Sequence, residues 1–328
     1  MPGDPDDPRF GAFPNVTDPA GEDELDETDA WIDALEDAMR ERGRPSADLS
    51  GLSPRQAARL VHRPLDADDV AVFADAVPTP EGVPVVHLVA PLLAAAADGP
   101  LRLTRHGYLP GPLARRIGAA FQERFGATAF DPLPTVVRGE RDLRALNVAR
   151  RTAECAGLLR RVGNDLRTTR AGRAALERSG PSPLLPRLLR AFYRHADAWE
   201  AVHGHVGPCV REGTGLTVYL LARFGGRPRP ARFYAERLLR AHPDAEHWFG
   251  PVRGSGAARQ RTLVDLCATT LLFRLAWTFG FASSPEGEER PDAFARPAER
   301  PLVRTPLLAA MIAFPVGAGA DDAHRGTA

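Results

Sequence analysis

The chain has 328 residues, of which 44% are hydrophobic and 26% charged, a composition typical of a globular protein with room for two or three domains. Its 42 basic side chains are all arginine, which excludes a P-loop phosphate-binding lysine, a Schiff-base lysine and a kinase-type lysine. The formal net charge is zero, but residues 1–50 carry 15 acidic and 4 basic side chains, so residues 51–328 carry a net charge of +11. A basic body after an acidic segment fits either a polyanionic partner or a solvated tail.

The N-terminal segment, residues 1–48, is predicted to be acidic and largely disordered. Within it, the helical spacing of Trp31, Leu35 and Met39 predicts a short amphipathic helix over residues 26–42. No basic-then-apolar leader opens the chain, and its apolar runs are too short to cross a bilayer. We therefore predict a cytoplasmic protein that does not bind membranes.

The first expected domain, residues 49–180, begins with Ser53 and Pro54, a cap and first-position pair that opens a helix. A second short helix is expected over 66–76, and a fully buried one over 84–97 in which His87 is a core imidazole. Residues 101–104 then read as a short strand, and another helix follows from Gly111.

The clearest pattern in this domain is a helix over 142–157 followed by a hairpin. The outer face of that helix is expected to present Arg141, Arg144, Asn147 and Arg151. The hairpin turns at residues 163–165, and Thr169 is expected to cap the next helix through its hydroxyl.

Three similar stretches, starting at Leu101, Leu166 and Leu302, each combine a strand-like step, a threonine and a new helical run. This pattern is typical of the last strand and last helix of a winged-helix unit. The predicted fold is mainly α with small β-hairpins, built from tandem winged-helix-like units and a helical middle segment. Residues 49–180 would hold two units, residues 181–315 a helical domain with a degenerate third unit, and residues 316–328 a disordered tail.

Arginine is concentrated between residues 138 and 173, a segment with ten arginines and only four acidic residues. In a DNA-binding winged helix, the exposed helix face and the hairpin would meet a groove and the phosphate backbone. The alternative is a solvated face in a chain without lysine. The candidate nucleic-acid-binding residues are Arg144, Arg151, Arg160, Arg161 and Arg167.

Other candidate chemistry is weaker. His203, His205 and Cys209 could ligate zinc, but no tight second pair of ligands accompanies them, so we predict no metal site. Residues 254–256 lack the remaining glycine and the preceding strand of a dinucleotide fingerprint. The cysteines, Cys155, Cys209 and Cys267, fit buried thiols. We predict no catalytic residue and no cofactor, with an enzyme built from scattered histidines, acids and arginines as the remaining alternative.

Several stretches resemble a family of bacterial proteins known only as plasmid open-reading-frame-three-like, found near mobile elements and related to proteins with the SEC-C zinc motif. The matching stretches are Gly51-Leu52-Ser53-Pro54, Leu103-Thr104-Arg105-His106-Gly107-Tyr108-Leu109-Pro110, Gly157-Leu158-Leu159 with Thr169 and Gly172, Phe233-Tyr234-Ala235, and Thr305-Pro306-Leu307. The resemblance covers roughly residues 50 to 315 and implies a helical, winged-helix-like body with no assigned activity. The cysteine cluster of the SEC-C motif is missing here.

From these observations we expect a non-enzymatic protein that binds duplex nucleic acid or has a regulatory role tied to mobile elements. In that version the acidic N-terminal segment competes for the arginine face in cis. The alternative is a protein-interaction or oligomeric scaffold that uses the apolar helices after Pro186 as its contact surface.

Overall fold

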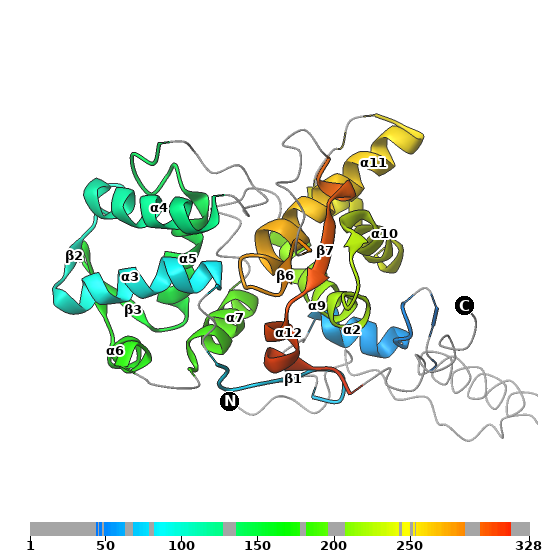
Figure 1. The fold of residues 1–328 in the computed structure, drawn as a ribbon, viewed down its shortest axis with the longest axis horizontal. Helices are drawn as coiled ribbons and strands as arrows, with labels where there is room; N and C mark the ends of the chain where they lie inside the picture. Colours follow the sequence, from blue (N-terminus) through cyan, green and yellow to red (C-terminus); the bar gives the residue numbers. More distant parts are fainter. Residues whose placement is uncertain are drawn as a thin grey trace, which may run out of the picture. The chain divides into compact units, whose positions relative to one another are not determined.

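The computed structural model describes residues 44, 46–47, 49–62, 68–78, 82–126, 136–177, 182–195, 207–242, 245–249, 252, 254–285 and 296–315 (Figure 1). By its contacts the chain separates into residues Met1–Arg44 and Pro45–Ala328, and only Arg44 of the first part is described. The helix expected over 26–42 and the tail expected over 316–328 lie outside the described residues.

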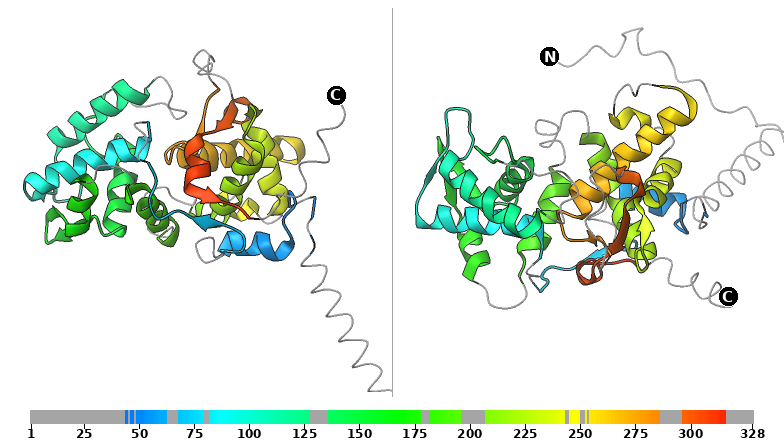
Figure 2. Two further views of the ribbon diagram at one scale, coloured as in Figure 1. Left: turned by 60° about the horizontal axis from the view of Figure 1, so that its bottom comes forward. Right: turned by 45° about the horizontal axis from the view of Figure 1, so that its top comes forward.

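Residues 84–177 form a sequence of elements that we call the first repeat. Its elements are α3 (Pro84–Asp98), β2 (Leu101–Arg102), α4 (Gly111–Phe125), α5 (Arg144–Cys155), β3 (Leu159–Val162), β4 (Asp165–Thr168) and α6 (Arg170–Glu177). The three strands form one antiparallel sheet in the order β2-β4-β3, with α3 packed against α4, α5 and α6 (Figure 1 and Figure 2). Leu101 pairs directly with Leu166. The expectation that these two residues mark separate units was therefore wrong, because their strands belong to one sheet.

Local sequence explains how α5 passes into the hairpin and then into α6. Gly157 has φ +66°, the left-handed conformation that ends a helix and that glycine adopts without strain. Thr169 accepts a hydrogen bond from the N–H of Gly172 at 3.1 Å, so it caps α6 as predicted. A Cβ atom on Gly172 would lie 2.3 Å from the carbonyl oxygen of Leu158, so only glycine allows α6 to approach the hairpin this closely.

Residues 207–311 repeat the same order of elements and form the second repeat. They comprise α9 (Gly207–Phe224), β5 (Arg229–Pro230), α10 (Ala231–Ala241), α11 (Gly256–Cys267), the π-helix η4 (Ala268–Ala276), β6 (Ala282–Ser283), β7 (Pro301–Arg304) and α12 (Pro306–Met311). Two short 3-10 helices accompany them, η3 (Ala245–Phe249) and η5 (Pro297–Glu299). The sheet order is β5-β7-β6, so the last strand again lies in the middle.

The register of the two sheets is also the same. Leu159 pairs with Thr168 in the first repeat, and Ala282 pairs with Arg304 in the second. Leu166 opposite Leu101 corresponds to Leu302 opposite Arg229. Residues 84–177 and 207–311 are therefore two structural repeats whose strand residues can be matched one to one.

The threonine motif marks the same point in both repeats. The Thr169 hydroxyl donates to the carbonyl of Gly157, and the Thr305 hydroxyl donates to the carbonyl of Gly280, which has φ +72°. The stretch at Leu101 is different, because the Thr104 hydroxyl accepts the N–H of Tyr108 within a turn and no helix begins there. The second and third copies of the motif are thus equivalent, and the first copy is not.

Three further elements border the repeats. Helix α2 (Pro54–His62) begins with a capping box in which Ser53 and Gln56 exchange side-chain and backbone hydrogen bonds. Strand β1 (Val72–Phe73) pairs with β8 (Ile312–Ala313), and α7 (Leu184–Arg194) follows the first repeat. The helix expected over 66–76 was wrong, because residues 72–73 pair with the chain's last described strand instead.

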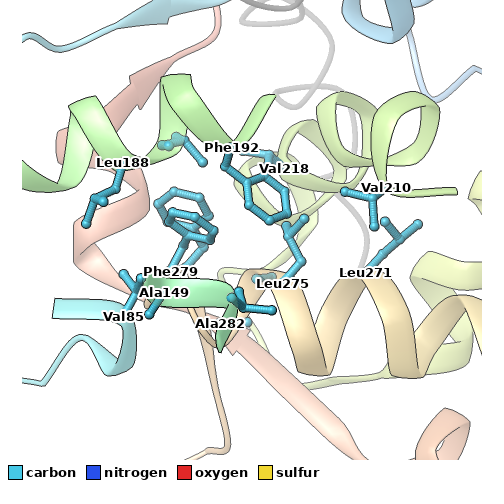
Figure 3. Close-up of a cluster of buried hydrophobic side chains, with 14 of the residues drawn as sticks. Val85, Ala149, Leu188, Phe192, Val210, Val218, Leu271, Leu275, Phe279 and Ala282 are labelled. Atoms are coloured by element: carbon cyan, nitrogen blue, oxygen red, sulfur yellow. The ribbon is translucent and has the colours of Figure 1, made fainter. Parts of the chain in front are cut away.

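The described residues are mainly helical with small antiparallel sheets, as predicted. One hydrophobic cluster runs through both repeats, and the buried side chains of α7 belong to the same cluster (Figure 3). Phe192 of α7 lies edge-on to Phe279, which follows η4, with ring centroids 5.1 Å apart. His87 is half-buried and packs edge-on against Phe125 with a centroid distance of 5.0 Å.

Candidate nucleic-acid interface

The strand arginines lie on the solvent face of the first sheet. Arg160 and Arg167 occupy directly opposite positions on β3 and β4, and both are exposed. The alternate positions, Leu159 and Leu166, are buried in the core because side chains alternate between the two faces of a strand. Alternation in the sequence therefore placed both arginines on the outer face.

Two like charges directly opposite each other destabilise an antiparallel pair by up to about 1 kcal/mol, so an anion near Arg160 and Arg167 would stabilise the sheet. One carboxylate of the protein is close: Asp165 lies 3.6 Å from Nη2 of Arg167, with the two side chains 34% and 49% exposed. An ion pair this exposed is worth under about 1 kcal/mol. The outer face therefore keeps a net positive charge.

A further arginine, Arg102, extends this face and was missed by the sequence analysis. It lies on β2 opposite Asp165, and its side chain is exposed. The signal was present in the repeated Leu-Arg step, because Leu101-Arg102 and Leu166-Arg167 alternate in the same phase. The sheet face consists of Arg102, Arg160 and Arg167.

Arg161 has a different environment at the hairpin turn. Its Nε donates to the carbonyl of Gly163 at 3.1 Å, and its Nη2 lies 3.4 Å from Oδ1 of Asn164. A Cβ on Gly107 would meet Nη1 of Arg161 at 3.3 Å, so this side chain lies beside the turn that contains the exposed Arg105. Arg161 is exposed but is held by the turn.

Helix α5 carries the second predicted pair, Arg144 and Arg151. Both are exposed, and seven residues of helix separate them by about 10 Å along the axis. Cys155, one turn beyond Arg151, is also exposed, which corrects the expectation of a buried thiol. Partial burial and the charge of Glu154 raise the pKa of Cys155, opposed by Arg151.

Asn147 was expected on the outer face of α5, and that expectation was wrong. It is 7% exposed, and its Nδ2 donates to Oε1 of Glu140 at 2.6 Å. Arg150, 3% exposed, donates to the same oxygen at 2.7 Å, and the N–H of Leu109 donates to the other oxygen at 2.6 Å. Helical periodicity placed Asn147 beside Arg144 and Arg151, but the turn that carries Glu140 covers this edge of the helix.

The second repeat offers an internal comparison for the arginine face. The residues that match Arg102, Arg160 and Arg167 by strand register are Pro230, Ser283 and Val303. The same backbone arrangement thus forms without any of these charges. The arginines of the first repeat are not required by the sheet itself.

The weaker metal candidate is divided between described and undescribed residues. His203 and His205 lie outside the described residues, while Cys209 is buried. Burial, and to a smaller extent the neighbouring Cys267 thiol, raises the pKa of Cys209 well above its ordinary value. Within the described ranges, no group of three histidines, cysteines or carboxylates has the geometry of a metal site.

Comparisons with known proteins give no match from which a function could be inferred, so the function is argued from the residues of this chain. No family model matches the chain, no curated protein matches it, and no solved structure matches it. The resemblance to plasmid open-reading-frame-three-like proteins therefore stays a prediction. Across the part of the chain that the structure describes, no helix is both long enough and apolar enough to span a membrane.

Proposed function

We propose that this protein binds duplex nucleic acid through the first repeat, and that each repeat is a winged-helix-like unit. The order of helices and strands, with the last strand central in each sheet, supports the winged-helix assignment. In such a unit the third helix and the hairpin face the nucleic acid, and these are α5 and the β3–β4 pair. A regulatory role near mobile elements rests on the family resemblance.

The observation that carries this proposal is the exposed cross-strand pair of Arg160 and Arg167. Without an anion the pair is electrostatically unfavourable. The second repeat has the uncharged residues Ser283 and Val303 at the matching positions. Arginine side chains on strands can donate two parallel hydrogen bonds to phosphate oxygens. Binding of this kind depends on salt and tolerates many sequences, because the contacts are to the backbone.

The test is the affinity of the full chain for mixed-sequence duplex DNA across a salt series. The double variant Arg160→Ala/Arg167→Ala should lower affinity and make the slope of log Kd against log salt shallower by about two, one unit for each phosphate contact removed.

The matched control is Arg187→Ala/Arg194→Ala, which removes two exposed arginines from one face of α7, outside the sheet. It should leave the slope within experimental error. Equal slopes for the two double variants would contradict the proposed interface.

The scaffold alternative relied on free apolar faces after Pro186. The large apolar residues of α7 and α9, including Leu188, Phe192, Leu216 and Leu220, are buried in the core. Among the described residues, the exposed large apolar side chains are Val72, Val136, Val162 and Leu176, none of which lies on these helices. The observations therefore favour nucleic-acid binding over the scaffold role.

A further inference from the structure

A second group of arginines lies at the end of helix α9, in the second repeat. It consists of Arg229 on β5, Arg237 on α10 and Arg304 on β7, which we call the arginine cluster. The Cζ atoms of Arg229 and Arg237 lie 4.3 Å and 3.7 Å from the ring centroid of Phe233. Contact with this ring and with Phe224 holds the planar guanidinium groups in place, since a cation is attracted to an aromatic face.

The cluster concentrates positive charge that the described protein does not neutralise with an ion pair. None of the described carboxylates lies within ion-pair distance of Arg229, Arg237 or Arg304. Burial and the charges of Arg240 and Arg229 lower the pKa of Arg237, opposed in part by Glu236. Burial is the larger of these effects, and repulsion between the arginines adds to it.

Tyr234 supplies a buried hydroxyl group next to these charges. Its side chain is fully buried, and within the described structure its hydroxyl has no hydrogen-bond partner. Burial raises the pKa of Tyr234 to about 12, while the charges of Arg229, Arg237 and Arg304 act in the opposite direction. The Tyr234 ring lies 5.2 Å, centroid to centroid, from the Phe233 ring on which Arg229 and Arg237 stack, and the charges of all three arginines act on its hydroxyl. An unpaired buried donor of this kind calls for an acceptor.

Each guanidinium group keeps free donors after its contacts with the protein. A guanidinium has five N–H groups, and each of these three arginines donates one hydrogen bond to a backbone carbonyl. Those bonds run from Arg229 Nε to Phe224 at 3.3 Å, from Arg237 Nη1 to Phe233 at 3.2 Å, and from Arg304 Nη1 to Ala222. The remaining donors are available for an acceptor outside the chain.

The first repeat shows that the fold does not require these arginines. By strand register, Leu101 matches Arg229 and Thr168 matches Arg304. The Thr168 hydroxyl donates to the carbonyl of Leu93 in α3, much as Arg304 donates to Ala222 in α9. A threonine has a single O–H group, which this bond uses, whereas the arginine has further N–H groups that remain able to donate.

We propose that Arg229, Arg237 and Arg304, together with the hydroxyl of Tyr234, bind a phosphate group. Three guanidinium groups and a hydroxyl offer more donors than the two oxygens of a carboxylate can accept, whereas a phosphate has three or more oxygens and a matching charge. The ligand is either a free phosphorylated molecule or the phosphate of a nucleic-acid backbone. This site is separate from the arginines of the first repeat and does not depend on them.

The experiment is calorimetric titration of the full chain with inorganic phosphate, at constant ionic strength maintained with chloride. The wild-type protein should bind phosphate saturably, and Arg237→Gln should weaken binding about tenfold or more, as expected for the loss of a charge-assisted contact. Tyr234→Phe should also weaken binding. The control Arg232→Gln, on the same helix but paired with Glu299 at the surface, should bind as the wild type does.

The thermal midpoint in phosphate-free buffer shows whether each variant is folded. If Arg237→Gln is unstable, Arg237→Lys takes its place: it keeps the charge and should bind phosphate more weakly than the wild type but still measurably. The proposal would be overturned if the wild type gave no heat of phosphate binding, or if Arg237→Gln and Arg232→Gln bound phosphate with equal affinity.

A second arm identifies the source of the phosphate. If the site contacts a nucleic-acid backbone, Arg237→Gln should also reduce the salt slope for duplex DNA by about one. If the natural ligand is a free phosphorylated molecule, phosphate binding is lost while the DNA slope is unchanged. Failure of DNA binding in the wild type with intact phosphate binding would reject the function proposed for the first repeat and keep this site.

Discussion

At the scale of single residues, Glu140 organises the buried side of the proposed DNA-binding helix. It is 1% exposed and accepts hydrogen bonds from Asn147, Arg150 and the backbone of Leu109. Its side chain thus ties the turn before α5 to both the helix and the loop after β2.

Replacement of Glu140 by glutamine should destabilise the protein by about 1–3 kcal/mol, because the buried Arg150 then keeps only Glu154 as its ion-pair partner. Urea denaturation measures the change in the free energy of unfolding. The control is Asp69→Asn, which removes the exposed partner of Arg59 and should cost less than about 1 kcal/mol. Similar losses for the two variants would show that the Glu140 network does not support the fold as described.

At the scale of elements, the two repeats use the same joint between the third helix, the hairpin and the last helix. In each, a glycine with positive φ ends the helical segment, and a threonine hydroxyl binds the carbonyl of that glycine. In the first repeat, Gly172 also brings α6 against the carbonyl of Leu158. The joint fixes the hairpin, and with it the outer face that carries Arg160 and Arg167.

Gly172→Ala should destabilise the protein by about 1–3 kcal/mol, although alanine is the better helix former, because the new methyl group would overlap the Leu158 carbonyl. Gly139→Ala is a matched control, since a Cβ there would meet no heavy atom within 4 Å. It should change stability by no more than about 0.5 kcal/mol. Chemical denaturation compares the two variants, and an unaffected Gly172→Ala protein would disprove the close approach of α6 to the hairpin.

At the scale of the whole molecule, the excess negative charge lies in the N-terminal segment and the excess positive charge in the rest of the chain. Residues 1–43 hold 14 acidic side chains and three arginines, so the rest of the chain carries a net charge of +11. The second unit of the chain, Pro45–Ala328, carries +10 of this charge, from 38 arginines and 28 acidic side chains. An acidic segment joined to a basic nucleic-acid-binding body lowers its affinity for phosphates through simple electrostatics.

A chain that begins at Arg44 should therefore bind duplex DNA more tightly than the full chain at low salt. The difference should shrink as salt rises, because screening weakens the competition between the acidic segment and DNA. Binding titrations of both chains at several salt concentrations measure it. A difference that persists unchanged at high salt would argue against an electrostatic role for the segment.

Local signals in the sequence determined much of this protein. The capping box at Ser53, the threonine cap at Thr169, the hairpin turn and the outward phase of Arg160 and Arg167 all follow from contacts within a few residues. Helical periodicity also placed the exposed Arg144 and Arg151 correctly. These features depend on dihedral preferences, caps and alternation, which neighbouring residues settle among themselves.

Only the tertiary structure decided which segments meet. Pairing of β2 with β4 merged two expected units into one, and pairing of β1 with β8 replaced an expected helix by a strand. The bond between Leu109 and Glu140, and the approach of Arg304 to the end of α9 where Arg229 also binds, likewise join residues that are distant in sequence. Such contacts have no local signature, because their free energy comes from partners that only the fold brings together.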